Sequence, residues 1–296
     1  MDIIGTVVSS LRAGRAYGRR ISKHGAWSMH FPRFAGTGFH VVLAGEGRLT
    51  AAGMEPVTVH PGDVVLVPHG AEHALGHVSA TTGFEFFCGV YRLGQVPLHP
   101  YLGQMPAVVV HPRGEGDVDL RDLADFVDRD VTRPAPGEQV MRAALVDLVV
   151  VHLLRRTSEE RRTDAWPAAA DSSIAPALHA LHDAPHEQWT LERLSTACAM
   201  SRGAFSRRFA SVVGTPPMKY LAQLRLAGGA RLLRETGEPL DAIARKVGYS
   251  TGFAFAHAFR REYGLAPGRY RSERGAQMSH PRMEPSSSIM VPPPAE

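Results

Sequence analysis

Hydrogen-bonding side chains stand together at Arg202, Ser206 and Arg207, in a segment that also carries two phenylalanines. Phe205 and Phe209 lie four residues apart, so on a helix they share one face, which we expect to be buried. The hydrogen-bonding side chains are then left on the opposite face. A guanidinium presented in this way donates two parallel hydrogen bonds to guanine O6 and N7, which discriminates that base by about 1–3 kcal/mol. The segment therefore predicts recognition of a nucleic acid.

The same segment occurs twice, with a period of 50 residues. The first copy contains Ser201, Phe205, Phe209, Gly214, Pro217 and Tyr220, and the second contains Thr251, Phe255, Phe259, Gly264, Pro267 and Tyr270. In each copy a short amphipathic helix precedes a tight turn, a hydroxyl residue then caps a second helix, and Gly-x-x-Pro ends it. This order predicts a helix-turn-helix, the second helix of which lies in the major groove of DNA.

The two second helices supply two sets of candidate DNA contacts. The residues predicted to reach base edges are Arg202, Gly203, Ser206 and Arg207 in the first copy and Gly252, Phe253, Ala256 and His257 in the second. The residues predicted to contact phosphates, which position the protein without reading sequence, are Ser201, Arg208, Lys219, Thr251, Arg260, Arg261 and Arg269. The second base-reading set has few hydrogen-bond donors. We expect it to contact thymine methyl groups or phosphates, or to contribute little specificity.

A long helix is predicted over Met218–Leu233, between the two copies. A rigid helix of that length would hold the two readers in successive major-groove segments, roughly 34 Å apart. Residues 173–274 carry a net charge of +7 and residues 1–155 a net charge of −1, so only the C-terminal part is expected to meet a polyanion. The alternative interpretation is a helical bundle with a basic surface that binds proteins.

The C-terminal repeat closely resembles the AraC/XylS family of transcription activators. The second copy reads Ile243-Ala-x-x-Val-Gly-Tyr249 and continues, after its two phenylalanines, as Gly264-x-x-Pro267-x-x-Tyr270-Arg271. The resemblance covers about residues 174–272 and implies a seven-helix DNA-binding domain with two recognition helices. The chain departs from the family at Phe253 and His257, where members often carry Ser and Arg.

Short strands are predicted in the N-terminal half, where apolar and β-branched runs between Phe39 and Val90 are separated by Gly and Pro. Five residues of this region, Gly62, Pro68, Gly70, His73 and Gly76, fit the spacing G-x5-P-x-G-x2-H-x2-G. This spacing resembles the second motif of the cupin superfamily, which implies a small β-barrel with the histidine inside. Regulators of the AraC type often carry such a barrel as a sensor, and one subgroup answers a small molecule or a chemical stress.

His40, His73 and Cys88 are the candidate residues of the sensor pocket. The two histidines, with Cys88 or His30, would supply the ligands of a zinc site. The favoured alternative is that His40 and His73 are hydrogen-bonded barrel residues without a metal, because spacing alone does not assemble three ligands. Cys88 is either a redox switch or a buried, inert thiol. The His-x-His and Glu set of a catalytic iron site is absent, since residues 38–47 offer only His40.

The chain is predicted to have two domains and a joining segment. Residues 1–155 form the sensor and dimerisation domain, in which 118–155 make a helical hairpin; residues 156–172 form the linker, 173–274 the DNA-binding domain and 275–296 a disordered tail. No apolar run approaches the roughly 18 residues needed to span a membrane. The two cysteines, Cys88 and Cys198, indicate a reducing compartment, so we expect a cytoplasmic protein.

The predicted fold class is thus α+β, with a cupin-like β-barrel and helical hairpin followed by an all-α domain with two helix-turn-helix motifs. The predicted function is sequence-specific transcription regulation, with activation implied by the family resemblance. The predicted partners are double-stranded DNA, an unidentified small-molecule effector, RNA polymerase and a second copy of the chain, and no membrane. The alternative is a cupin-type metalloenzyme fused to a DNA-binding domain.

Overall fold

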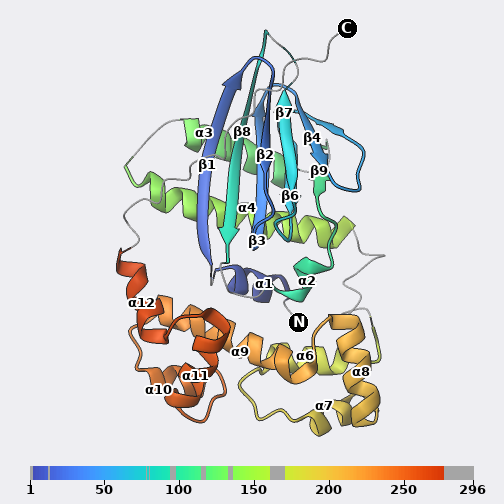
Figure 1. Ribbon diagram of the computed structural model, residues 1–296, viewed down its shortest axis with the longest axis vertical. Coiled ribbons are helices and arrows are strands. Elements are labelled where there is room, and N and C mark those ends of the chain that lie inside the picture. The colour runs from blue at the N-terminus through green and yellow to red at the C-terminus, as the bar shows by residue number, and fades with distance from the viewer. Residues whose placement is uncertain are drawn as a thin grey trace. The chain divides into compact units, whose positions relative to one another are not determined.

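The computed structural model describes residues 3–12, 14–77, 79, 81–93, 98–114, 118–132, 136–160 and 171–276. They fall into two compact units (Figure 1). One unit is built from strands between residues 14 and 94, together with residues 105–155. The other is helical and contains most residues after 156, together with residues from 1–13 and 95–104.

The strand unit contains two antiparallel sheets. The five-stranded sheet has the order β1 (Arg15–His24), β8 (Gly83–Arg92), β3 (Gly36–Ala44), β6 (Val64–Val67) and β9 (Val109–His111). The four-stranded sheet has the order β2 (Trp27–Phe31), β7 (His73–His77), β4 (Gly47–Ala51) and β5 (Val57–Val59). The strands predicted between Phe39 and Val90 are therefore confirmed.

Alternation along β8 gives the five-stranded sheet two apolar faces. Phe84, Phe86 and Cys88 belong to a buried cluster with side chains of the other sheet, so this face forms the barrel interior. Phe87 points to the opposite face, where a Cβ added at Gly18 would meet both the Phe87 ring and the Val146 side chain. Two helices cover this outer face, α3 (Val118–Thr132) and α4 (Glu138–Glu160), which form the predicted hairpin (Figure 1).

Glycine at position 70 shapes the turn that leads into the β7 histidine. Its φ of 62° is left-handed, and a Cβ there would lie 2.1 Å from the carbonyl oxygen of Phe34. Only glycine accommodates both conditions without strain. The Pro68 carbonyl in the same turn accepts a 2.7 Å hydrogen bond from the buried Thr37 hydroxyl. The motif that resembles the cupin pattern therefore fixes the entry of β7 into the barrel.

The helical unit carries the sequence repeat. Its helices after the linker are α6 (Ala175–Asp183), α7 (Leu191–Ala197), α8 (Arg202–Val213), α9 (Pro217–Glu235), α10 (Leu240–Lys246), α11 (Gly252–Tyr263) and α12 (Pro267–Ala276). The hydroxyls of Ser201 and Thr251 accept hydrogen bonds from the third residue beyond them, and Gly214 and Gly264 end α8 and α11 in the left-handed conformation. The repeated residues thus set the same helix boundaries twice. None of the described helices is long and apolar enough to cross a membrane.

Gly229, one of two adjacent glycines within α9, allows α11 to approach this helix closely. A Cβ on Gly229 would lie 2.5 Å from the Phe255 ring, and one on Gly228 would lie 3.6 Å from Val247. Glycine within a helix costs roughly 1 kcal/mol relative to alanine. At position 229 this cost permits the packing of the second helix-turn-helix against the central helix.

Two short helices from the first 155 residues belong to the helical unit and not to the barrel. They are α1 (Ile3–Leu11), which packs against α9, and α2 (Pro100–Gly103). The apolar side chains of Val7, Val8 and Leu11 are buried, which accounts for the attachment of α1. The linker was predicted to begin at residue 156, but α4 continues to Glu160. Residues 161–170 and the predicted tail beyond Ala276 lie outside the described residues.

Candidate nucleic-acid interface

The first helix-turn-helix presents its predicted base-reading residues on the solvent side of α8. Phe205 and Phe209 are completely buried, as the spacing predicts. Arg202, Gly203 and Arg207 are exposed and Ser206 is half-buried. The structure therefore brings these four residues together on one accessible face, where guanidinium and hydroxyl groups are available for hydrogen bonds.

The second helix-turn-helix presents a different surface on α11. The Phe253 side chain is 83% exposed, His257 is exposed and Ala256 is half-buried. Gly252 is buried, its N–H donates a 2.7 Å hydrogen bond to Oδ1 of Asp241, and a Cβ there would lie 2.6 Å from the same oxygen. We therefore withdraw Gly252 from the base-reading set, because its role is to fit the start of α11 against α10.

The residues predicted to contact phosphates are all on the surface. The exposed members are Ser201, Arg208, Lys219, Thr251, Arg260, Arg261 and Arg269. Arg208 forms a 2.6 Å ion pair with Asp171 Oδ2, a contact that sequence spacing does not predict. Hydrogen bonds from Ser173 and the Arg208 guanidinium lower the pKa of the Asp171 carboxyl, so the pair is charged on both sides near neutral pH.

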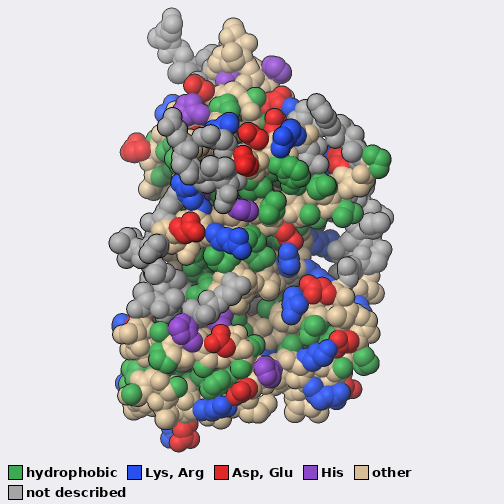
Figure 2. Space-filling model, turned by 180° about the vertical axis from the view of Figure 1, so that it is seen from behind, with side chains coloured by type: hydrophobic (Ala, Val, Ile, Leu, Met, Phe, Trp, Pro, Cys, Tyr) green, Lys and Arg blue, Asp and Glu red, His purple; other side chains and the backbone are tan. Residues whose placement is uncertain are grey.

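Charge alone does not outline an interface. The face of the molecule in Figure 2 carries basic and acidic side chains interspersed, without a continuous basic stripe among its coloured atoms. Exposed cations also occur where the sequence analysis did not assign a role, such as Arg245 on α10. The candidate interface is therefore taken from the exposed faces of α8 and α11.

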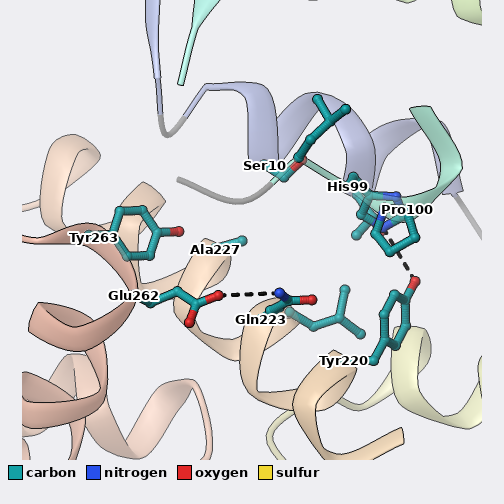
Figure 3. A pocket seen from close by; sticks show the side chains of 11 residues that line it. Ser10, His99, Pro100, Tyr220, Gln223, Ala227, Glu262 and Tyr263 are labelled. Atoms are coloured by element: carbon teal, nitrogen blue, oxygen red, sulfur yellow. Dashed lines mark hydrogen bonds between the residues drawn. The ribbon is translucent and has the colours of Figure 1, made fainter. Parts of the chain in front are cut away.

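A partly buried series of hydrogen bonds joins α1 and α2 to the helices that support α8. Thr6 Oγ1 and His182 Nδ1 are 3.1 Å apart, His182 Nε2 and the Tyr220 hydroxyl 2.7 Å, and that hydroxyl and His99 Nε2 3.3 Å. Figure 3 shows Tyr220 rising from α9 toward His99. Sequence patterns do not predict these hydrogen bonds, because the bonds join residues far apart along the sequence.

The donor and the acceptor of each of these hydrogen bonds follow from the backbone contact of His99. The Tyr101 N–H donates to His99 Nδ1, so a neutral His99 carries its proton on Nε2 and donates it to the Tyr220 hydroxyl. With a neutral His182, the Tyr220 hydroxyl then donates to His182 Nε2, and His182 donates from Nδ1 to Thr6. Burial and the nearby His182 lower the pKa of His99 to about 3, which keeps it neutral. The adjoining cavity is lined in part by Ser10, Gln223 and Glu262.

In the barrel, His40 and His73 form a buried pair. Their Nε2 atoms are 2.8 Å apart, and His73 Nδ1 donates a 2.8 Å hydrogen bond to the Ala71 carbonyl. The Nε2 of neutral His73 therefore accepts a hydrogen bond from the Nε2–H of His40, which leaves His40 Nδ1 as a buried acceptor without a partner in the described structure. Burial, with repulsion between the two rings, lowers the pKa of His40 well below its ordinary value. Phe31 stacks on His73 at 4.8 Å between ring centroids.

This geometry bears on two open alternatives, the role of Cys88 and the presence of a zinc site. Cys88 lies opposite His40 in the register of β8 and β3, but burial raises the pKa of its thiol to about 12. A thiolate is disfavoured there, which favours the inert interpretation over a redox switch. His30 lies on the surface and pairs with Glu72 at 2.8 Å. Within the described residues no three His, Cys, Asp or Glu side chains converge, so the three-ligand zinc set is not assembled.

Two protein-family models match this chain. A cupin model matches residues 2–159 and a helix-turn-helix domain model matches residues 194–273. A putative AraC-like transcription regulator of Streptomyces antibioticus is 30% identical over 92% of this chain and 98% of its own length. The transcriptional regulator AlkR of Acinetobacter baylyi is 26% identical over 92% of this chain and all of its own.

A further relative and a solved structure also match this chain. The RCS-specific transcriptional activator RclR of Escherichia coli is 28% identical over 86% of this chain and 89% of its own. The crystal structure of the DNA-binding domain of AdpA with a target DNA matches at 30% identity, covering 36% of this chain and 98% of that one, with a TM-score of 0.35. These relatives are transcription regulators and not enzymes. The chain therefore belongs to the AraC family of helix-turn-helix transcription regulators that carry an N-terminal cupin domain.

Proposed function

We propose that α8 and α11 read an operator in two major-groove segments and that the exposed cations around them hold the DNA backbone. The observation that carries this proposal is the exposure of Arg202 and Arg207 on the side of α8 opposite its buried phenylalanines. Selection of binding sites from genomic fragments, followed by gel shifts with Arg207→Ala, tests it. Loss of preference at one guanine supports the assignment, and a wild-type protein without sequence preference removes it.

Among the residues assigned to phosphates, Arg208 also has an internal ion pair, so its variants can distinguish a contact with DNA from a structural role. Its ion pair with Asp171 leaves the guanidinium half-exposed and able to reach a phosphate as well. If Arg208 contacts a phosphate, Arg208→Ala lowers the slope of log affinity against log salt by about 1. Asp171→Asn removes the same ion pair but leaves the cation, so it is the matched control, and its slope stays that of the wild type.

The signal enters through the barrel and reaches the central helix through α1 and α2. Both helices are continuous in sequence with barrel strands, α1 with β1 and α2 with β8 and β9, and both lie in the helical unit. The partly buried series of hydrogen bonds from Thr6 to His99 joins them to Tyr220 at the start of α9. A small-molecule or chemical-stress signal that alters the strands would thus change the support of α8. His40, His73 and Cys88 line the region of the barrel that we assign to the signal.

Tyr220→Phe tests this route, because it removes one hydroxyl and keeps the ring. An effector is first identified by thermal shift against a compound library. The wild-type protein then changes operator affinity with effector, whereas Tyr220→Phe binds the effector equally and changes operator affinity much less. An effector that leaves operator affinity, oligomeric state and transcription unchanged in the wild type contradicts the coupling itself.

Helices α3 and α4 supply the surface that we assign to a homodimer. Several large apolar side chains are exposed on them: Phe126, Val140, Met141 and Leu148. Val140 is 74% exposed, and a charge placed there would oppose burial against a second copy. Size-exclusion chromatography with light scattering should find a dimer for the wild type and a monomer for Val140→Glu. The exposed charge change Glu159→Gln is the control.

Activation through RNA polymerase in the cytoplasm completes the proposal. Transcription in vitro from the selected operator, with purified polymerase and with or without the protein, measures its direction. An increase in transcript supports an activator, and a decrease identifies a repressor.

A further inference from the structure

The side chain of Phe253 is unusually exposed for an aromatic residue. It is 83% exposed, more than any other large apolar side chain in the described part of the chain. Its exposure is not a consequence of a loose helix. Thr251 caps α11, Gly252 is hydrogen-bonded to Asp241, and Phe255 is fully buried two residues beyond. The backbone therefore holds the ring in solvent at a fixed place.

The repeat shows which function this place has in the first copy. At the 50-residue period Phe253 takes the position of Gly203, and Ala256 and His257 take those of Ser206 and Arg207. At these positions α8 presents a guanidinium and a hydroxyl, whereas α11 presents a phenyl ring, a methyl group and an imidazole. Arg260 and Arg261 lie exposed at the end of the same helix, so the apolar face sits beside cations that suit a phosphate backbone.

We propose that α11 recognises thymine through its C5 methyl group, with Phe253 as the principal contact and Ala256 beside it. This inference rests on the proposed function, in which α11 enters the major groove. Thymine is the only base that offers a methyl group there, and apolar side chains contact it. The operator would then have one half-site read by hydrogen bonds from α8 and a second, thymine-containing half-site read by apolar contact from α11.

Selection from randomised DNA duplexes tests the division between half-sites. The wild-type protein should select a two-part site with fixed guanine in one part and fixed thymine in the other. Phe253→Ala should lose the thymine preference alone, Arg207→Ala the guanine preference alone, and Phe253→Leu should keep the wild-type site because it keeps an apolar contact. Since Phe253 is exposed, its replacement should leave the fold intact, which circular dichroism and thermal unfolding check.

Replacing the selected thymines by deoxyuridine tests the methyl group directly. Deoxyuridine pairs like thymine but lacks the methyl, whose burial corresponds to an affinity change of about fourfold. The wild type should lose about that factor for each contacted thymine, and Phe253→Ala should lose almost none. Unchanged wild-type affinity overturns the inference while leaving the proposed function in place.

Two further outcomes also count against the inference. If Phe253→Ala binds the selected DNA like the wild type but activates transcription poorly, the ring contacts a protein, and the thymine assignment is wrong. If the wild type selects no sequence at all, the proposed function fails first and this inference fails with it.

Discussion

The two helix-turn-helix copies share their interior and differ on the surface. Phe205 and Phe255 are both fully buried, and Ser201 and Thr251 cap their helices in the same way. On the exposed side, Arg207 stands where the second copy has His257. The repeated positions named here form the core and the helix caps, whereas the positions that differ are the ones to which we assign base recognition. A duplicated framework can in this way carry two readers with different chemistry.

The shared interior predicts the largest effects. Phe205→Ala and Phe255→Ala each remove a fully buried ring, and each should lower the free energy of unfolding by about 3–5 kcal/mol. Denaturant unfolding of the full chain measures both. A cost below 1 kcal/mol for either variant would show that the two cores are not equivalent.

The differing surfaces predict an unequal effect on DNA affinity. Arg207→Ala should weaken binding to the selected operator by about 1–3 kcal/mol, because a guanidinium–guanine pair is lost. His257→Ala should weaken it less than Arg207→Ala, since the second reader depends on apolar contact. Fluorescence anisotropy at fixed salt gives both values. Equal losses would contradict the division of chemistry between the two copies.

A comparison of Tyr220 with Tyr270 predicts that the stability of the first copy alone depends on pH. Tyr220 joins the buried His99 chain, whereas Tyr270 packs against Phe259 with 5.1 Å between ring centroids. The pKa of His99 is lowered to about 3 in the folded state, against 6.5 ordinarily. As pH falls from 6.5 toward 3, the unfolded chain binds a proton that the folded chain refuses, so stability decreases over that window.

Hydrogen exchange measured at pH 7 and pH 4.5 checks this prediction. Amides of α6 and of the first turns of α9 should lose protection at the lower pH, and amides of α11 should change less. His99→Gln should reduce the difference between the two pH values. Equal loss of protection in both copies would indicate that His99 is not its cause.

The turns of the two copies predict the smallest effect. Ala199 holds a left-handed φ of 51° in the first turn, and Gly248 holds a φ of 90° in the second. Ala199→Gly should stabilise the chain by less than about 1 kcal/mol, because relief of strain is partly offset by glycine's entropy. Gly248→Ala should destabilise it, since the new Cβ would lie 2.7 Å from the His186 carbonyl. Thermal unfolding measures both signs, and stabilisation by Gly248→Ala would contradict the comparison.

Local pattern was enough to predict most of the fold. The helices of the repeat, their caps and the buried phenylalanines depend on residues within a few turns of one another. The long central helix was predicted as Met218–Leu233 and is observed as Pro217–Glu235. Strands β3, β5, β6 and β8 of the barrel follow from short apolar runs between glycines and prolines in the same way, whereas β1, β2, β4, β7 and β9 were not predicted from such runs.

The features that could not be predicted all depend on contacts between distant residues. Gly252 is unavailable to DNA because Asp241 lies against it, and Arg208 has an acidic partner before α6. Helix α1 joins the helical unit through side chains that are merely apolar in the sequence. The pairing of His40 with His73 was expected as hydrogen bonding, but its proton arrangement required the Ala71 carbonyl.

The most direct test of the account is an interference footprint on the selected operator, with methylation of guanine N7 as one probe and uracil in place of thymine as the other. Wild-type protein should show contacts in two major-groove segments about one helical turn, or 10–10.5 base pairs, apart. Arg207→Ala should lose the guanine contacts of one segment and retain the other. Contacts confined to a single segment, or loss of both segments in Arg207→Ala, would contradict the claim that α8 and α11 read DNA separately.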